Sequence, residues 1–168
     1  MINWIFFPRS EEPTDLVRQV VSVFTDAEPE LKKRFKELKS DVVLSIVRPG
    51  LEEIGFQVEK GKKAAEKIKV PVLFGPQGKV VKAFEADAWH REGKMVVEVE
   101  AGRGYINNQF LKDLFQACMM HGIEYCGIAV RNKYIDSPDY EYVVSFFETL
   151  YASNRLQLPL KGVLIVGY

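Results

Sequence analysis

The sequence is poor in the residues and patterns that mark several classes of protein. Only two of its 168 residues are cysteines, which is too few for a disulfide framework. Cys118 and Cys126 stand at no metal or redox spacing, so we expect both to be buried small hydrophobic residues. This cysteine usage predicts a reducing, cytoplasmic location.

The chain also lacks an excess of charge of either sign and a long hydrophobic run. Lys and Arg together number 23, as do Asp and Glu, so any affinity for DNA must come from a local patch. The apolar opening at 2–7 is short and has no basic start, which predicts neither a signal peptide nor a membrane span. No repeat or low-complexity segment is present. The 47% hydrophobic content and the length predict one domain over 1–168.

Two alternating runs stand out against this background. Residues 84–89 (FEADAW) and 94–100 (KMVVEVE) are joined by a short polar turn, and each predicts a strand with carboxylates on one face. A loop of two or four residues places Asp87 opposite Glu98 and Glu85 opposite Glu100. A three-residue loop would instead drive Asp87 toward the core. The even loop keeps one face of the hairpin apolar and dry and the other acidic and wet.

Carboxylates placed directly opposite one another destabilise a sheet, so this acidic hairpin predicts a bound cation. Hard oxygen ligands suit Mg²⁺ or Mn²⁺. We expect Asp87 and Glu98 to bind the metal together with the backbone carbonyl of Val99. Glu100 would hold a second ion or accept a proton, and the clustered carboxyls should have raised, coupled pKa values. The alternative is a solvent-facing acidic surface, and Glu85 fits either role.

The remaining pattern alternates helices and strands. Helical spacing of apolar residues predicts helices over about 14–24, 29–39, 40–54, 107–121 and 140–151. Shorter apolar runs predict strands at 56–59, 70–74, 125–130 and 163–166. The order strand, helix, strand after the hairpin predicts a right-handed parallel crossover. The whole reads as an α/β fold with a core at about 40–134, helices at 14–39 before it and a helix and strand at 140–167 after it.

Several polar residues are candidates for contact with DNA. A cation and the free N–H groups of a helix start can hold a phosphate, and other polar residues follow a strand end beside the acidic hairpin. The candidates are Arg103, Asn107, Asn108, Arg131, Asn132 and Lys133. Helix capping and ordinary loop polarity explain them as well. The lysines of the connecting loop at 60–69 and of the charged helix at 29–39 form further basic segments, the latter either a solvated face or a phosphate contact.

Asp87, ten intervening residues and then Glu98-Val99-Glu100, set in two strands before a crossover helix, resemble the PD-(D/E)xK nuclease superfamily. The similarity is to its BamHI/BglII-type restriction endonuclease branch and covers about 40–134. Glu100 stands where most members have lysine, although some BamHI-like members have glutamate, and this leaves the general base open. The usual proline before Asp87 is also missing.

The resemblance implies a restriction-endonuclease-like core, with a central mixed β-sheet flanked by helices. It also implies Mg²⁺-dependent hydrolysis of DNA, with Glu53, or its rival Glu52, as an extra acidic catalytic residue. Cutting both strands would need two sites and hence a homodimer, for which 2–7 or 142–151 could supply an interface, although core packing explains these segments equally well. The competing hypotheses are a nuclease-fold protein that binds nucleic acid or protein without cutting, and a plain interaction domain.

Overall fold

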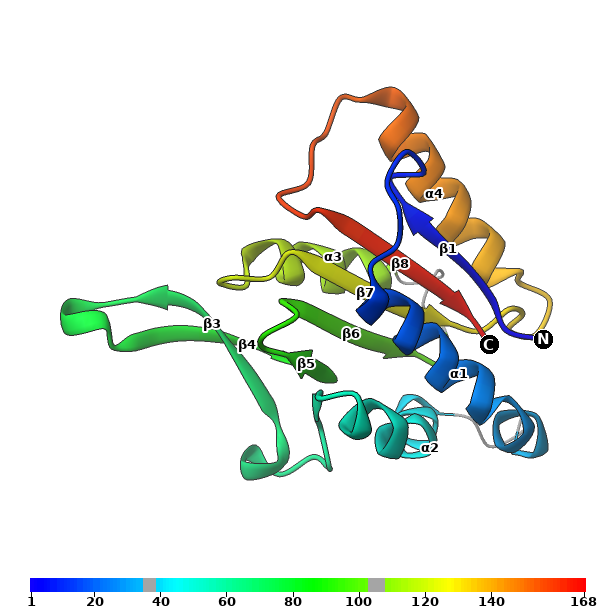
Figure 1. Ribbon diagram of the computed structural model, residues 1–168, viewed down its shortest axis with the longest axis horizontal. Coiled ribbons are helices and arrows are strands. Elements are labelled where there is room, and N and C mark those ends of the chain that lie inside the picture. The colour runs from blue at the N-terminus through cyan, green and yellow to red at the C-terminus, as the bar shows by residue number, and fades with distance from the viewer. Residues whose placement is uncertain (35–38, 103–107) are drawn as a thin grey trace.

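The computed structural model describes residues 1–34, 39–102 and 108–168. It confirms the predicted fold class, a mixed α/β fold in which helices flank a central mixed sheet (Figure 1). The strands of this sheet lie in the order β1 (Asn3–Phe7), β8 (Gly162–Gly167), β7 (Tyr125–Val130), β6 (Met95–Glu100), β5 (Ala88–His90) and β2 (Gln57–Val58). The helices are α1 (Asp15–Lys33), α2 (Ser40–Glu53), α3 (Gln109–Met119) and α4 (Asp139–Ser153). No helix in the described part of the chain is long and apolar enough to cross a membrane.

The centre of the sheet is parallel and its edges are antiparallel. β6 pairs with β7 and β7 with β8 in parallel, whereas β1 and β5 run antiparallel to their neighbours. The parallel crossover predicted after the acidic hairpin is therefore present, with α3 between β6 and β7. A second crossover, through α4, joins β7 to β8.

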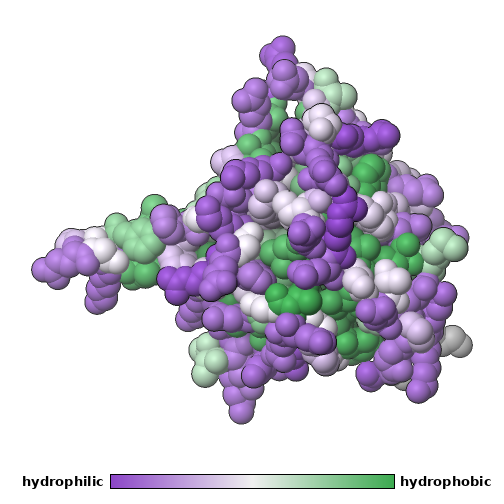
Figure 2. All heavy atoms as spheres, in the orientation of Figure 1, coloured by the Kyte–Doolittle hydropathy of each residue, from purple (hydrophilic) through white to green (hydrophobic). Residues whose placement is uncertain are grey.

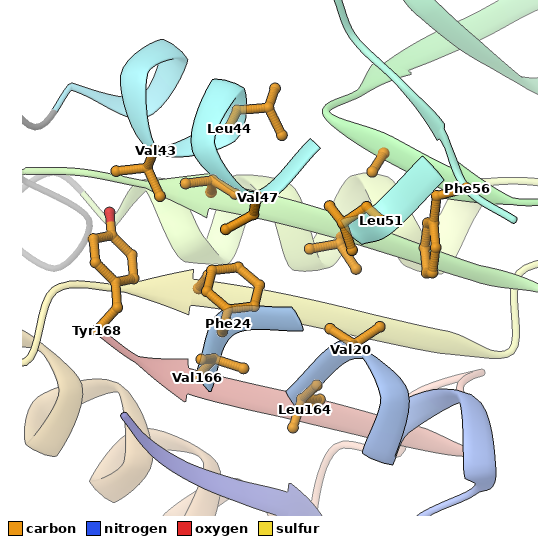
Figure 3. Packing of buried hydrophobic residues seen from close by; sticks show 14 of the residues in the cluster. Val20, Phe24, Val43, Leu44, Val47, Leu51, Phe56, Leu164, Val166 and Tyr168 are labelled. Carbon is orange, nitrogen blue, oxygen red and sulfur yellow. The ribbon is translucent and has the colours of Figure 1, made fainter. Parts of the chain in front are cut away.

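The sheet separates two hydrophobic clusters. Leu164 and Val166 of β8 face the cluster with α1 and α2, while Val163 and Ile165 face the cluster with α3 and α4. All four are completely or almost completely buried, and each such side chain contributes roughly 1.5–3 kcal/mol of hydrophobic free energy. Figure 3 shows side chains of the first cluster: Val20, Phe24, Val47, Leu51, Leu164 and Val166.

The first helix differs from the prediction of two helices at 14–24 and 29–39. Thr14 caps α1 by accepting a hydrogen bond from the Val17 N–H at 3.3 Å, but the helix continues through Pro29 to Lys33. Leu31 lies seven residues after Phe24 and is buried with it in the same cluster, so the apolar stripe continues past the proline. Residues 35–38 of the predicted second helix lie outside the described residues.

The segments considered for a dimer interface are used inside the molecule. Residues 3–7, for which no strand was predicted, form β1 at the edge of the sheet, with Phe6 and Phe7 buried on opposite faces. In α4, Val143 and Phe147 are fully buried. Core packing therefore accounts for the buried face of each segment, while Trp4 and Tyr142 stay exposed, and a homodimer remains a prediction.

The acidic hairpin differs from the prediction in one respect that shapes the site. Residues 80–86 form β4 (Val80–Ala86), which pairs with β3 (Ile68–Phe74) in a separate two-stranded sheet. This arm projects from the body (Figures 1 and 2). The expected pairing of Glu85 with Glu100 is wrong, because Glu85 lies opposite Lys69 in the arm. Ala86 and Ala88, which an unbroken strand would place on one face, belong to opposite clusters, because the chain changes sheet at Asp87.

Candidate functional site

The site begins at the break between β4 and β5. Ala88 pairs with Val97 and His90 with Met95, so the connecting turn has an even length and the register continues to Asp87 opposite Glu98, as predicted. One step further, Ala86 would face Val99, but β4 has left the sheet there. The Val99 N–H donates instead to Oδ2 of Asp87 at 2.8 Å. The carboxylate thus replaces a missing backbone partner, which fixes its position at the end of the strand.

Asp87 and Glu98 are also connected directly. The Asp87 N–H donates to Oε2 of Glu98 at 3.4 Å, a long hydrogen bond. The N–H and C=O of a residue in a strand point to the same side, so the carbonyl of Val99 faces the same side of β6 as the N–H that binds Asp87. The two carboxylates and this carbonyl therefore meet along one edge of β6.

The predicted metal ligands line one hollow of about 450 Å³, which we call the acidic hollow. Its carboxylates are Glu59, Glu85, Asp87, Glu98, Glu100 and Asp113, with Val99 between them. The expectation that this face is wet is wrong for Glu98, which is only 8% exposed. The reason is the crossover helix α3, which packs over this side of β6.

Asp113 is a member of the cluster that the sequence patterns did not predict. It is buried on α3 and shares a hydrogen bond with the carboxyl of Glu100. Its Oδ2 is buried and has no hydrogen-bond partner among the described residues. One signal was available: Asp113 lies in the apolar stripe of the helix, between Phe110 and Leu114, where a carboxylate needs a partner.

Burial controls the protonation of the cluster. It raises the pKa of Asp87 to about 6, against the opposing effect of the hydrogen bond from Val99. Burial, together with the charge of Asp87, raises the pKa of Glu98 well above its usual range. Burial and the hydrogen bond to Asp113 raise the pKa of Glu100 to about 8. The raised and mutually dependent pKa values expected for these three carboxyls are therefore present.

Two lysines line the acidic hollow, Lys67 and Lys112, and ion pairs hold Lys67 at its rim. Nζ of Lys67 lies 2.8 Å from Oε1 of Glu59 and 3.7 Å from Oε2 of Glu85. The hydrogen bond to Glu59 raises the pKa of this lysine, so it stays charged at neutral pH. Lys67 was expected only in a basic connecting loop, and the pairing of β3 with β4 brings it to the carboxylates.

The donor atoms suit a hard divalent cation. All are carboxylate or carbonyl oxygens, as Mg²⁺ prefers, and the buried Oδ2 of Asp113 lacks a partner that a cation would supply. Within residues 1–34, 39–102 and 108–168, however, no group of three or more His, Cys, Asp or Glu side chains stands close enough to hold a metal ion. The residues fit a divalent cation by their chemistry and line one hollow, and binding would require their side chains to draw together.

Glu53 is not brought to this cluster. It lies exposed at the end of α2 and lines a different hollow, with Gln19 and Asp26 of α1. The other end of the helix meets the acidic hollow, where Oγ of Ser40 accepts a hydrogen bond from the Ala101 N–H at 3.2 Å. At 1.5 Å per residue, Glu53 is about 20 Å further along the helix axis. The structure therefore does not bring Glu53 to the other predicted catalytic carboxylates, and its rival Glu52 lies about 18 Å along the axis from Ser40.

The predicted DNA contacts on the crossover divide into two groups. Arg103 and Asn107 lie outside the described residues. Asn108 occupies the N-cap position of α3 with a left-handed backbone (φ 51°), but its side chain makes no capping hydrogen bond. Its exposed amide remains a candidate contact.

Two of the three candidates after β7 serve the fold. Arg131 is buried, with its guanidinium 5.3 Å from the ring centre of Tyr134. Asn132 accepts a hydrogen bond from Nδ2 of Asn3 and donates one to the carbonyl of Met1, both at 2.9 Å. Both side chains are engaged within the fold, because the loop packs against the chain ends, and their contact with DNA stays a prediction. Lys133 is exposed and remains a predicted contact.

Comparison with known proteins identifies a solved structure with a similar fold. No family model and no curated protein matches the chain. Among solved structures, it is similar to the restriction endonuclease BglII in complex with a DNA 16-mer, with a TM-score of 0.50 and 12% sequence identity. The similarity covers 99% of this chain and 75% of that one. The fold is therefore restriction-endonuclease-like, while membership of the PD-(D/E)xK superfamily stays a prediction.

Proposed function

We propose that this protein is a metal-dependent DNA endonuclease that hydrolyses phosphodiester bonds with Mg²⁺ or Mn²⁺. The observation that carries the proposal is the convergence of Asp87, Glu98, Glu100 and Asp113 in one hollow, at the point where a strand leaves the sheet. Burying several like charges together costs free energy, and structures keep such clusters chiefly at functional sites. Similarity of fold to an enzyme solved with DNA supports the choice of substrate.

Asp87, Glu98 and the carbonyl of Val99 would hold the cation. When bound, it would lower the pKa of a water molecule and offset charge on the phosphate. Asp87 is positioned for this by the Val99 N–H, which fixes one of its oxygens and leaves the other for a ligand. Glu98 is fixed less tightly, by the 3.4 Å hydrogen bond from Asp87.

Glu100 stands where a lysine is usual in the family this chain resembles, and its surroundings suit a proton acceptor. A general base works best when its pKa lies near the working pH, and burial with the Asp113 hydrogen bond raises the pKa of Glu100 to about 8. Asp113 would position this carboxyl rather than touch the substrate. Lys67 at the rim, paired with Glu59 at 2.8 Å, would place near the phosphate the positive charge that the motif itself lacks.

Plasmid nicking tests the proposal. Purified protein with Mg²⁺ or Mn²⁺ should convert supercoiled plasmid to nicked or linear DNA. Asp87→Asn and Glu98→Gln should reduce the rate more than about a hundredfold, since even residues behind metal ligands commonly cost 10–100-fold. Glu53→Gln is the matched control, because Glu53 is an exposed carboxylate outside the acidic hollow. Nicking that survives in Asp87→Asn, or that falls equally in Glu53→Gln, would contradict the assignment.

A second function is favoured by one observation. Because no three acidic side chains of the described residues stand at metal-binding distance, a nuclease-fold protein that binds nucleic acid without cutting it is the alternative. Calorimetric titration with Mn²⁺ separates the two. Binding lost in Asp87→Asn supports the nuclease, and no binding at millimolar Mn²⁺ supports the binding module.

A further inference from the structure

A second hollow adjoins the acidic one and carries the opposite charge. It has a volume of about 640 Å³, and we call it the basic hollow. Lys39 and Arg48 line it from the α2 side, and Lys60 and Lys62 from the loop after β2. We infer that the basic hollow binds phosphate groups of the nucleic-acid strand next to the bond that is cut, an inference that rests on the function proposed above.

The protein does not neutralise these four cations itself. In the part of the chain that the structure describes, no ion pair joins Lys39, Arg48, Lys60 or Lys62 to a carboxylate. Nε of Arg48 is buried, and no hydrogen-bond partner for it lies among the described residues. Native proteins rarely leave a buried donor unpaired, and a small movement of the Arg48 side chain would let a phosphate oxygen in the hollow pair with it.

The carboxylates at the same hollow are already engaged. Glu59 is paired with Lys67 at 2.8 Å. Oδ1 of Asp41 accepts a hydrogen bond from the Val42 N–H at 2.9 Å. Asp87 lies at the boundary with the acidic hollow, which it also lines. Positive charge therefore prevails in the rest of the basic hollow, in a chain whose net charge is zero.

The two hollows share part of their walls, which relates the inferred site to the cutting site. Ser40, Glu59, Lys67 and Asp87 line both of them. The Glu59 N–H donates to the carbonyl of Asp87 at 2.8 Å. Lys60, the first lysine of the loop that lines the basic hollow, therefore directly follows a residue bonded to Asp87. Phosphates repeat about every 3.4 Å along the axis for each strand of DNA. A strand with one phosphate at the acidic hollow thus brings its neighbours to the lysines.

The salt dependence of DNA binding tests this inference without any cleavage. The probe is a fluorescein-labelled DNA duplex, titrated with protein in EDTA at several salt concentrations and followed by fluorescence anisotropy. Each phosphate contact contributes about 0.9 to the slope of log K against log salt. The double variant Lys60→Gln/Lys62→Gln should therefore make this negative slope less steep by roughly 1.8. Both lysines are exposed, so the variant should fold, which circular dichroism verifies.

The matched control is Arg9→Gln/Arg155→Gln, which removes the same charge from exposed positions that line neither hollow. Its slope should equal that of the wild type. Three results would overturn the inference. They are a slope in the lysine variant equal to that of the wild type, a change in the control as large as that in the lysine variant, and no DNA binding by the wild type. If the slope falls while Asp87→Asn still nicks plasmid, the basic hollow stands and the assignment of the acidic hollow as the cutting site fails. If Asp87→Asn is inactive while the slope is unchanged, the nuclease stands and the basic hollow falls.

Discussion

Neutralising Asp87 should make the metal-free protein more stable at alkaline pH. Burial raises the pKa of this carboxyl from 3.8 to about 6, so the folded state binds its proton more tightly than the unfolded state does. Below pH 3.8 both states are protonated and the residue costs nothing. Between pH 3.8 and pH 6 the unfolded chain releases the proton while the folded protein keeps it, so the free energy of unfolding falls as the pH rises. Above pH 6 the loss is complete.

The size of the effect follows from the shift. About two pKa units correspond to roughly 3 kcal/mol, and residual solvent access to the side chain reduces this to about 1–3 kcal/mol. Asn has the shape of Asp and keeps an oxygen for the Val99 N–H, which donates to Asp87 at 2.8 Å. We therefore expect Asp87→Asn to raise the free energy of unfolding by about 1–3 kcal/mol at pH 8, and by little near pH 4.

Urea unfolding in EDTA, measured for the wild type and for Asp87→Asn across this pH range, provides the test. The difference between the two proteins should grow from pH 4 to pH 6 and then level off. A variant less stable than the wild type at pH 8, or a difference independent of pH, would refute the reasoning. Either of these two results would mean that the surroundings stabilise the charged carboxylate and that Asp87 is a structural residue.

Three further outcomes are expected. At pH 8, Mg²⁺ at about 100 times its Kd should stabilise the wild type by ~2.7 kcal/mol, seen as a rise in Tm of roughly 5–10 °C, and should not stabilise Asp87→Asn. Phe147→Ala should lower the free energy of unfolding by about 3–5 kcal/mol in urea, because Phe147 is fully buried and its ring stacks on Phe7; a loss below ~1 kcal/mol would contradict the packing. Tyr168→Phe should cost about 1–3 kcal/mol by the same measurement, since it deprives the Glu100 carbonyl of a donor at 2.9 Å, and an unchanged stability would show that this carbonyl finds another partner.

Elements with a strong local pattern could be predicted from the sequence. The charge-free run Tyr125–Val130 forms β7 with the predicted bounds, because a strand buried on both faces needs apolar residues at every position. β1 was missed because its partner, β8, lies at the other end of the chain, with Asn3 opposite Gly167. A short apolar run does not by itself reveal such a pairing.

The site was predictable to the extent that it depends on alternation within two neighbouring strands. This placed Asp87 opposite Glu98 and both in one hollow with Glu100. Alternation could not show that the strand breaks at Asp87, because the same period runs through β4 and β5. Asp113 and Lys67 reach the hollow through a crossover helix and through the arm, and long-range packing of this kind leaves no periodic signal.

The outer half of the arm is largely exposed, and it meets the body where the ring of Phe74 lies edge-to-face with His121, with ring centres 5.0 Å apart. Leu73 and Val81 are 58% and 61% exposed, and neither belongs to a hydrophobic cluster, whereas Val70 and Ala86 at the base do. Insertions, deletions or a grafted sequence beyond the base would leave the body and its carboxylates in place. The hairpin tip is thus a place where descendants of this fold can change length and acquire new recognition surfaces independently of the chemistry below.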